Sequence, residues 1–429
     1  MQISVNKFFL YFFLLILLSN CGFVKKDVVE QNNEGKDIFE KIEPIQKELN
    51  PKLNIQLSKL TKEKPFLNNN SNNSGNINFE TNFQKTSSYK FKVIKKYKHN
   101  QPELIFTDDK NIIFFDGKGS VFKINEDLKE VWKVNNYNKK EKKLNPILYF
   151  AQNGQNLIVN DNLSKLYSIK LSNGDVVWSK YNRSSFNSDI KIFKDRFFTI
   201  DFDNVIRCFS IKDGKEIWNF KSENSFIKSQ KKLSLLLKDD IVFFINNLGD
   251  ITALDSKNGS LVWQTPTQSN VIYQNAFTLE NSDLVFANNS IYFSNNKNEF
   301  FSIDIKSGII KWKQTVNSIL RPTVIENLIF SISTEGFLFV IEDQTGNILR
   351  INNTLANIKN KNNEVKPIGF VVARNKIYLS LNNGRLLKID IKTGLQENIY
   401  KLHGSKISRP YVLNGNMYLI KDNAIIKTN

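Results

Sequence analysis

The 429-residue sequence has few of the side chains that most enzyme and metal sites require. It contains two cysteines, Cys21 and Cys208, and two histidines, His99 and His403. Two distant cysteines cannot build a disulfide framework, and without a CxxC pair they offer no zinc or redox motif. So few histidines argue against most histidine-based acid/base and metal chemistry. We therefore expect no catalytic residues, no cofactor and no bound metal.

Acidic side chains are also in deficit. There are 60 Lys and Arg against 42 Asp and Glu, a net charge of +18. Such an excess can indicate a nucleic acid or an anionic surface as the partner. The lysines, however, are spread along the chain and mixed with asparagine, and no basic stripe is interleaved with stacking aromatics. We interpret the charge as a solvated surface and expect no nucleic-acid partner.

No apolar run is long enough to span a bilayer comfortably. The longest, Phe8–Leu18, has eleven residues and follows Lys7, as in the core of a signal peptide. It ends at Leu18-Ser19-Asn20-Cys21, which resembles the bacterial lipobox, although Asn20 departs from the usual small residue. The resemblance implies that residues 1–20 are a lipoprotein signal peptide and that Cys21 is lipidated, with several acyl chains giving firm anchoring. The alternative is an ordinary secretory signal with a chance cysteine.

The residue after the cysteine bears on the destination. It is Gly22 and not the aspartate associated with inner-membrane retention. We therefore expect lipid anchoring at the periplasmic face of the outer membrane. The following stretch is rich in Lys, Glu, Asn and Ser, and it cannot bury enough apolar surface to offset its ordering entropy. We predict that residues 21–87 form a flexible, lipid-anchored tether, within which residues 37–60 could form a short helix on a partner.

Beyond residue 88 the chain repeats a pattern of a small or apolar residue, Gly six places on and Trp ten places on. ALDSKNGSLVW at 253–263 is a full copy, and seven copies begin 38–49 residues apart. The repeated glycines are Gly174, Gly214, Gly259, Gly308, Gly346 and Gly394. All five tryptophans of the chain fall in the pattern: Trp132, Trp178, Trp218, Trp263 and Trp312. Periods in the forties with strand signals indicate a β-propeller.

The end of the chain predicts how the propeller closes. Residues 417–428 align without gaps on 377–388, so an eighth repeat stops where its outermost strand should begin. That blade would expose an edge, which residues 88–98 are placed to cover. We expect each repeat Gly in a turn with positive φ, and each Trp to pack against the neighbouring blade. The predicted fold is all-β: an eight-bladed propeller over residues 88–429.

The repeat resembles that of pyrroloquinoline-quinone (PQQ)-type propellers. Together with the lipobox and the eight blades, it resembles the BamB family, the propeller lipoproteins of the outer-membrane β-barrel assembly (BAM) machinery. The resemblance implies a non-enzymatic scaffold that docks on the POTRA domains of a BamA-type insertase. It also implies other BAM lipoproteins, and possible unfolded outer-membrane proteins, as partners.

The same resemblance points to two interblade loops as the docking surface. In the loop 224–232, Ile227 and Lys228 match a Leu-Arg pair of the family, although the fork of the arginine is lost. In the loop 278–284, Glu280 and Asp283 match an acidic pair. The alternative for each of the four residues is a solvated loop side chain without a partner.

Two other functions stay open. One is a lipid-anchored propeller for another envelope protein or a polysaccharide. The other is a relative of the quinone-dependent dehydrogenases, which resemble this chain in the Trp motif but have an adjacent cysteine pair. Cys208 stands alone at a small-residue position of a repeat and is expected to pack as an apolar group.

Overall fold

The computed structural model of the chain divides into two units, Met1–Ile42 and Glu43–Asn429. The structure describes residues 43–58, 60, 70–81, 83, 86–94, 102–222, 231–267, 279–358, 364–402, 406–421 and 423–428. The predicted signal peptide, Cys21, Ile227, Lys228 and both histidines lie outside the described residues. In the described part of the chain, no helix is both long and apolar enough to cross a membrane.

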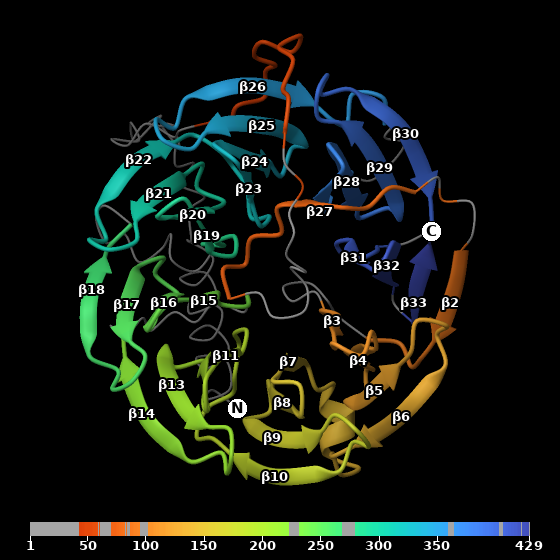
Figure 1. Ribbon diagram of the computed structural model, residues 1–429, viewed down its shortest axis with the longest axis vertical. Coiled ribbons are helices and arrows are strands. Elements are labelled where there is room, and N and C mark those ends of the chain that lie inside the picture. The colour runs from red at the N-terminus through yellow and green to blue at the C-terminus, as the bar shows by residue number, and fades with distance from the viewer. Residues whose placement is uncertain are drawn as a thin grey trace, which may run out of the picture. The chain divides into compact units, whose positions relative to one another are not determined.

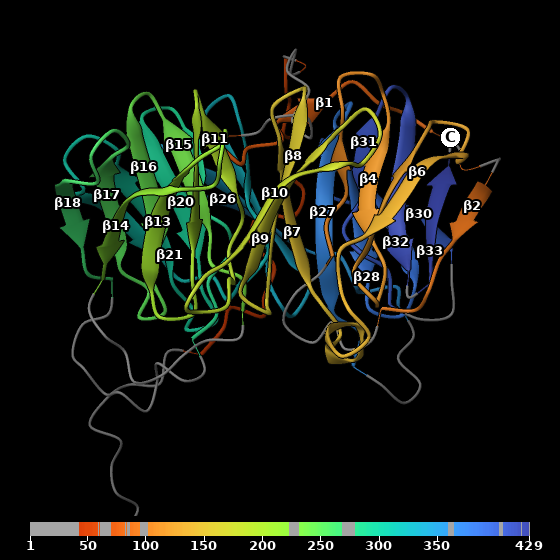
Figure 2. The same ribbon diagram turned by 90° about the horizontal axis from the view of Figure 1, so that it is seen from below.

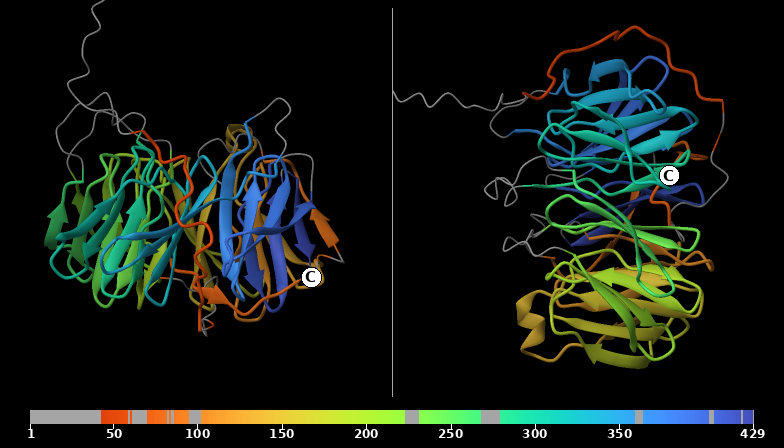
Figure 3. Two further views of the ribbon diagram at one scale, coloured as in Figure 1. Left: turned by 90° about the horizontal axis from the view of Figure 1, so that it is seen from above. Right: turned by 90° about the vertical axis from the view of Figure 1, so that its left-hand side faces the viewer.

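Within Glu43–Asn429, eight β-sheets are arranged in a ring, which confirms the predicted eight-bladed propeller (Figure 1; side views in Figure 3). Each sheet runs from an innermost strand at the centre to an outermost strand at the rim. Blade 1 consists of β3 (Ile105–Phe106), β4 (Ile112–Phe115), β5 (Ser120–Ile124) and β6 (Glu130–Asn135), and blade 2 of β7 (Leu148–Gln152), β8 (Asn156–Asp161), β9 (Lys165–Lys170) and β10 (Val176–Tyr181). Blade 3 consists of β11 (Lys191–Phe193), β12 (Arg196–Ile200), β13 (Val205–Ser210) and β14 (Glu216–Lys221), and blade 4 of β15 (Leu235–Lys238), β16 (Ile241–Ile245), β17 (Ile251–Asp255) and β18 (Leu261–Thr265).

Blades 5 to 8 continue the ring, and two of them include a strand from the N-terminal part of the chain. Blade 5 consists of β19 (Val285–Ala287), β20 (Ser290–Ser294), β21 (Phe300–Asp304) and β22 (Ile310–Gln314), and blade 6 of β23 (Thr323–Ile325), β24 (Leu328–Ile332), β25 (Phe337–Glu342) and β26 (Ile348–Asn353). Blade 7 consists of β27 (Pro367–Ala373), β28 (Lys376–Leu381), β29 (Arg385–Asp390) and β30 (Gln396–Lys401), together with β1 (Asn76–Ile77). Blade 8 consists of β31 (Tyr411–Leu413), β32 (Asn416–Lys421) and β33 (Ala424–Thr428), together with β2 (Thr86–Lys90).

An N-terminal strand completes blade 8. β2 pairs antiparallel with β33, from Thr86 opposite Thr428 to Lys90 opposite Ala424. The strand begins earlier than the predicted 88–98, and residues 91–94 are not in a strand. Because β2 covers the free edge of β33, the ring closes by hydrogen bonds between the two ends of the propeller.

The repeat residues lie where one blade meets the next. Trp263 of blade 4 donates its indole N–H to the carbonyl of Ile305 in blade 5, at 3.1 Å. Gly308 has φ +75°, and a Cβ there would come within 2.6 Å of Trp263 Cε3. The same contact recurs from Trp132 to Gly174, Trp178 to Gly214, Trp218 to Gly259 and Trp312 to Gly346. The glycine thus lets the indole lie flat on the turn of the following blade.

Blade 6 has Arg350 in place of the Trp. Its side chain is fully buried, and its guanidinium donates to the carbonyls of Ile391 and Lys392 in blade 7, at 2.7 and 2.9 Å. It also donates to the carbonyl of Leu53, at 2.8 Å. The segment 49–58 therefore covers the junction at which the tryptophan contact is missing.

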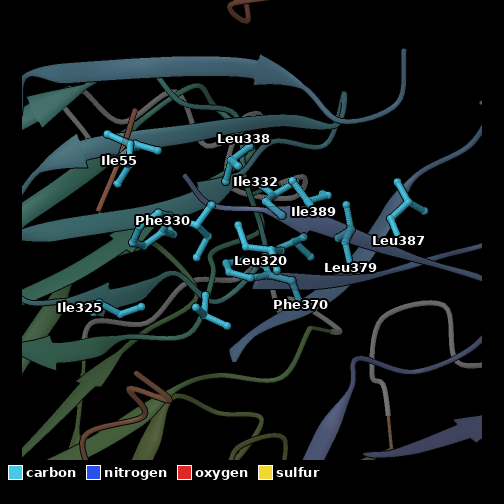
Figure 4. Packing of buried hydrophobic residues seen from close by; sticks show 14 of the residues in the cluster. Ile55, Leu320, Ile325, Phe330, Ile332, Leu338, Phe370, Leu379, Leu387 and Ile389 are labelled. Carbon is cyan, nitrogen blue, oxygen red and sulfur yellow. The ribbon is translucent and has the colours of Figure 1, made fainter. Parts of the chain in front are cut away.

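Apolar packing holds this covering segment in place. Ile55, which is 6% exposed, belongs to the cluster of apolar side chains between blades 6 and 7. Figure 4 shows Ile55 near Phe330, within the cluster that also includes Leu320 and Leu338. The backbone adds contacts, because Leu49 pairs with Ile351 across an antiparallel bridge.

The described parts of residues 21–87 therefore lie on the propeller, which differs from the predicted flexible tether. In Figure 1 the segment that includes β1 crosses the centre of the ring from blade 4 towards blade 7. There the asparagines of 70–76 serve as hydrogen-bonding groups for strand edges. The polar composition of this segment predicted disorder. The asparagines are nevertheless ordered, because their side chains form hydrogen bonds to backbone groups and do not depend on apolar burial.

Candidate functional site

The two faces of the propeller differ in their connections. In a four-stranded antiparallel blade, the loops that lead from one blade to the next emerge on one face, together with the turns between second and third strands. We call this the loop face. The other two turns of each blade emerge on the opposite face, which we call the turn face (Figure 2).

Charged side chains meet around the central axis just inside the loop face. Five of them lie two residues before the first residue of an innermost strand: Glu103, Asp189, Asp283, Arg321 and Arg409. Lys232, three residues before β15, joins them. Since the repeat places this position towards the axis in each blade, residues far apart in the sequence come together. We call these six residues the charged ring.

Ion pairs link the members of the charged ring. Lys232 Nζ lies 2.7 Å from Asp189 Oδ1 and 2.9 Å from Glu103 Oε1. Arg321 Nη2 lies 2.5 Å from Asp283 Oδ2. Glu103 Oε1 is also 3.8 Å from the guanidinium groups of both Arg321 and Arg409. Three acids and three bases therefore balance one another in a partly buried network.

The network fixes the charge state of four of its members near neutral pH. Burial alone would raise the pKa of Glu103, but attraction to Lys232, Arg409 and Arg321 outweighs it and lowers the pKa to about 2. The pKa of Asp283 is held well below its usual range, because Arg321 and Lys232 outweigh the cost of burial. The pKa of Lys232 is raised, despite burial, by Asp189 and Glu103. The pKa of Arg409 is raised, also despite burial, by Tyr411 and Glu103. None of these four groups exchanges a proton near pH 7, so they are unsuited to general acid/base catalysis.

Two lysines beside the ring behave differently. Burial lowers the pKa of Lys231 to about 8, although Glu280 and Asp283 oppose the shift. Burial also lowers the pKa of Lys191 to about 8, with Asp189 opposing it. Lys231 donates to the carbonyl of Asn281, which ties the two candidate docking loops to each other.

A cavity opens on each side of the charged ring. The one towards the loop face has a volume of about 480 Å³, and we call it the loop-face cavity. Its charged lining consists of Glu103, Lys231, Lys232, Glu280, Asp283, Arg321, Lys366, Lys406 and Arg409. The inner cavity, of about 360 Å³, lies between the ring and the segment that includes Asn70 and Asn72.

The N-terminal segment bounds the inner cavity at the turn face. Asn72 Nδ2 donates to the carbonyls of Leu235 and Leu284, at 2.8 and 2.9 Å, which joins blades 4 and 5. Asn73 donates to the carbonyl of Val324 and accepts from its N–H, at 2.9 and 3.1 Å, which adds blade 6. β1 then pairs in parallel with β27 of blade 7. A single stretch of chain thus connects the inner edges of four blades.

The structure places the candidate docking residues unevenly. Glu280 lines the loop-face cavity, and its backbone N–H is hydrogen-bonded to Asn296 Oδ1 at 3.0 Å. Asp283 belongs to the charged ring, and its carboxylate is engaged by Arg321. The structure thus brings the two acidic residues to one cavity, Asp283 as a member of the charged ring and Glu280 near Lys231.

The sequence reasoning missed the charged ring, although a signal was present. A charged residue followed by Leu, Ile or Pro directly precedes the innermost strand in five blades, and in a sixth blade the pair lies one residue earlier. These pairs are Glu103-Leu104, Asp189-Ile190, Lys232-Leu233, Asp283-Leu284, Arg321-Pro322 and Arg409-Pro410. The reasoning followed the Gly and Trp positions of the outer strands and did not examine this second repeated position.

Chemistry elsewhere in the described residues is sparse. No group of three or more His, Cys, Asp or Glu residues that could hold a metal ion occurs among them. Cys208 is fully buried in blade 3, and burial raises the pKa of its thiol to about 12. Asp255 and Asp304 accept hydrogen bonds from backbone N–H groups of the turns that follow them. These carboxylates therefore cap turns, as their repetition in the sequence indicates.

Solved structures show where the fold recurs. BamB from Moraxella catarrhalis aligns with a TM-score of 0.61 at 14% identity, over 80% of this chain and 98% of that one. Quinohemoprotein alcohol dehydrogenase from Comamonas testosteroni aligns with a TM-score of 0.64 at 9% identity, over 84% and 79%. Both likenesses show the fold alone. A comparison with curated protein sequences finds no match.

The family follows from a comparison of the sequence. The sequence model of a family described as outer membrane protein assembly factor BamB matches residues 117–352, more than half of the chain. The match includes both candidate docking loops and extends from blade 1 to blade 6. The chain therefore belongs to the BamB family of PQQ-like propellers.

Proposed function

We propose that the protein is a non-enzymatic scaffold of the outer-membrane β-barrel assembly machinery, which docks through its loop face on POTRA domains of a BamA-type insertase. Membership of the BamB family over the propeller body is the observation that carries this proposal. The charge states of the ring support it, because fixed charges suit recognition better than proton transfer. Other BAM lipoproteins, and unfolded outer-membrane proteins, are the further partners that the family suggests.

The docking residues in this proposal are Ile227, Lys228, Glu280 and Asp283. Ile227 supplies an apolar anchor and Lys228 a positive group, while Glu280 supplies a negative group at the rim of the loop-face cavity. Asp283 contributes through the ion pair with Arg321 and not as a free carboxylate. A few such residues can dominate an interface of moderate size.

Membrane attachment is the second part of the proposal. Residues 1–20 direct export, and lipid on Cys21 anchors the protein at the periplasmic face of the outer membrane. Replacement of Cys21 by Ala should abolish acyl labelling and release the protein from membranes. Continued acyl labelling of the Cys21→Ala variant would disprove lipidation at this site.

Affinity for a POTRA fragment from the same organism tests the docking. Ile227→Asp should weaken binding by more than about 1 kcal/mol without changing thermal stability. Glu280→Lys should act mainly on the association rate and on its salt dependence. Lys306→Glu, in an exposed turn of the turn face, is a control that should leave binding unchanged.

The outcomes separate the candidate functions. Binding that persists in both loop variants would place the interface elsewhere on the propeller. No binding by the wild-type protein would favour another envelope partner or a polysaccharide.

A further inference from the structure

The N-terminal segment is held by one repeated position of the propeller. The N–H groups of Leu237, Phe286 and Val324, in blades 4, 5 and 6, all donate to oxygen atoms of residues 70–73, at 2.9–3.1 Å. Each of the three pairs with the second residue of the next strand in its blade, so their positions are equivalent. In blade 7 the equivalent residue is Val372, which pairs with β1. The repeat therefore presents the same point of each of these innermost strands to the axis.

A second repeated position lies two residues earlier. In blades 4 and 5 it is Leu235 and Leu284, whose carbonyls both accept from Asn72 Nδ2. Alternate residues of a strand turn their backbone groups to the same edge, so both positions face the axis, and we call them the axis positions. Through them the strand edges hold residues 70–76, which have no apolar side chain, by hydrogen bonds.

The axis positions of two other blades line the inner cavity. They are Phe150 and Gln152 in blade 2, and Ile190 and Ile192 in blade 3. The innermost strands of these blades, β7 and β11, end their sheets at the axis, and no strand in the described part of the chain pairs with that edge. The segment thus binds the inner edges of blades 4 to 7, and the cavity lies against the same edges of blades 2 and 3.

The inner cavity lies beside the bound segment and reaches the turn face. Asn70 and Asn72 form part of its wall, so a peptide inside it would lie alongside the chain's own segment. Asp108 and Asn153 also line it, and both are exposed residues at turns of the turn face in blades 1 and 2. The volume of about 360 Å³ is within the range of small-ligand sites, about 300–1,000 Å³.

Strand edges of this kind recognise a ligand through its main chain. An extended peptide that adds to the edge of a sheet is bound by its N–H and C=O groups, and its side chains need only fit the space. We propose that the inner cavity binds an extended segment of another polypeptide, with small polar side chains such as Asn and Ser, against β7 and β11. Such a peptide repeats on blades 2 and 3 the contacts that residues 70–77 make with blades 4 to 7.

This inference does not rest on POTRA docking, which is proposed for the loop face. The test uses the purified full-length protein in detergent and a fluorescein-labelled octapeptide amide with the sequence of residues 70–77, Asn-Ser-Asn-Asn-Ser-Gly-Asn-Ile. The comparison peptide is the same sequence with every peptide nitrogen methylated, which keeps the side chains and removes the main-chain donors. Fluorescence anisotropy should show at least tenfold tighter binding of the unmethylated peptide.

Two variants locate the site. Ile192→Pro removes a backbone N–H that faces the axis, and on an edge strand this breaks no bond within the blade. Ile105→Trp places a larger side chain in the cavity wall of blade 1. Each variant should weaken binding of the peptide fivefold or more. Val412→Pro is the matched control, because Val412 has the equivalent position in blade 8 but does not line the cavity, and it should leave binding unchanged.

Hydrogen–deuterium exchange gives a local readout in the wild-type protein. Addition of the peptide should slow exchange of the Ile192 amide. The Leu237 amide already donates to the carbonyl of Asn70, so it should exchange equally slowly with and without the peptide. Thermal unfolding of each variant shows whether its propeller is intact.

Four results would overturn the inference. They are equal affinity for the methylated and unmethylated peptides, unchanged binding in both cavity variants, an unchanged exchange rate at Ile192, and dimerisation of the wild-type protein that Ile192→Pro abolishes, which would place a second copy in the cavity. Each can occur while POTRA binding persists, so failure of this inference is distinguishable from failure of the proposed function.

Discussion

The contact between Trp263 and Gly308 allows a quantitative test of how the blades are held together. The indole packs on the turn of blade 5, and its N–H donates to the carbonyl of Ile305. Trp263 is half-buried, so Trp263→Ala removes roughly 100–150 Å² of apolar contact, worth about 2.5–4 kcal/mol. The lost hydrogen bond adds about 1 kcal/mol. We expect a total loss of about 3.5–5 kcal/mol in the free energy of unfolding.

Gly308 supplies the matched partner for a double-mutant cycle. Gly308→Ala should be destabilising for two reasons: a left-handed residue with a Cβ costs about 1–2 kcal/mol, and that Cβ collides with the Trp263 ring. With Ala at 263 the collision disappears, so the two losses should fall short of additivity by at least about 1 kcal/mol. Trp263→Phe keeps a ring but loses the donor, and it should cost less than Trp263→Ala.

Urea unfolding followed by far-ultraviolet circular dichroism measures these free energies without relying on tryptophan fluorescence. A loss below about 1 kcal/mol for Trp263→Ala would refute the proposed role of the indole between blades. Additive effects of the two substitutions would also refute it, since they would mean that ring and glycine do not act on each other.

Four further predictions concern other parts of the propeller. Arg350→Ala should cost about 2–4 kcal/mol in urea unfolding and increase proteolysis within residues 43–58, because three carbonyls lose their donor. Deletion of Thr86–Lys90 should expose the edge of β33 and cause aggregation, visible by light scattering. The pKa of Glu103 is about 2, below its usual 4.5, so stability should be lost as the pH falls from 4.5 towards 2, and Glu103→Gln should flatten this dependence. Cys208, with its thiol pKa raised to about 12, should react with a thiol reagent only on unfolding.

The repeat in the sequence was sufficient to predict the blades. A Gly and a Trp at fixed spacing recur because every blade meets the next through the same contact, so the pattern records a local requirement. The missing outer strand of the last copy likewise indicated closure by an N-terminal strand. The predicted strand, 88–98, begins two residues after β2 does and extends past its end. The reason is that polar and apolar residues continue to alternate beyond Lys90, where the pairing with β33 ends.

The N-terminal stretch shows where composition misleads. Residues 70–76 contain no apolar side chain, and a segment of that kind is normally disordered. Here it meets the inner edges of four blades, where backbone groups need partners and Asn72 and Asn73 supply them. Arg350 is a second case. It stands where other repeats have Trp, and nothing in the sequence indicated that its guanidinium would donate to the carbonyl of Leu53.

The sequence by itself therefore determined the fold, the number of blades and the family, because these depend on residues at fixed spacing within one blade and its neighbour. Only the tertiary structure decided the charged ring and the cavity above it. The ring's six residues come from six blades, and their charges balance only when the ring is closed: Glu103, Asp189, Lys232, Asp283, Arg321 and Arg409. The sequence shows the repeated position that carries these charges, but it does not show which of them pair, since each partner is placed by a different strand.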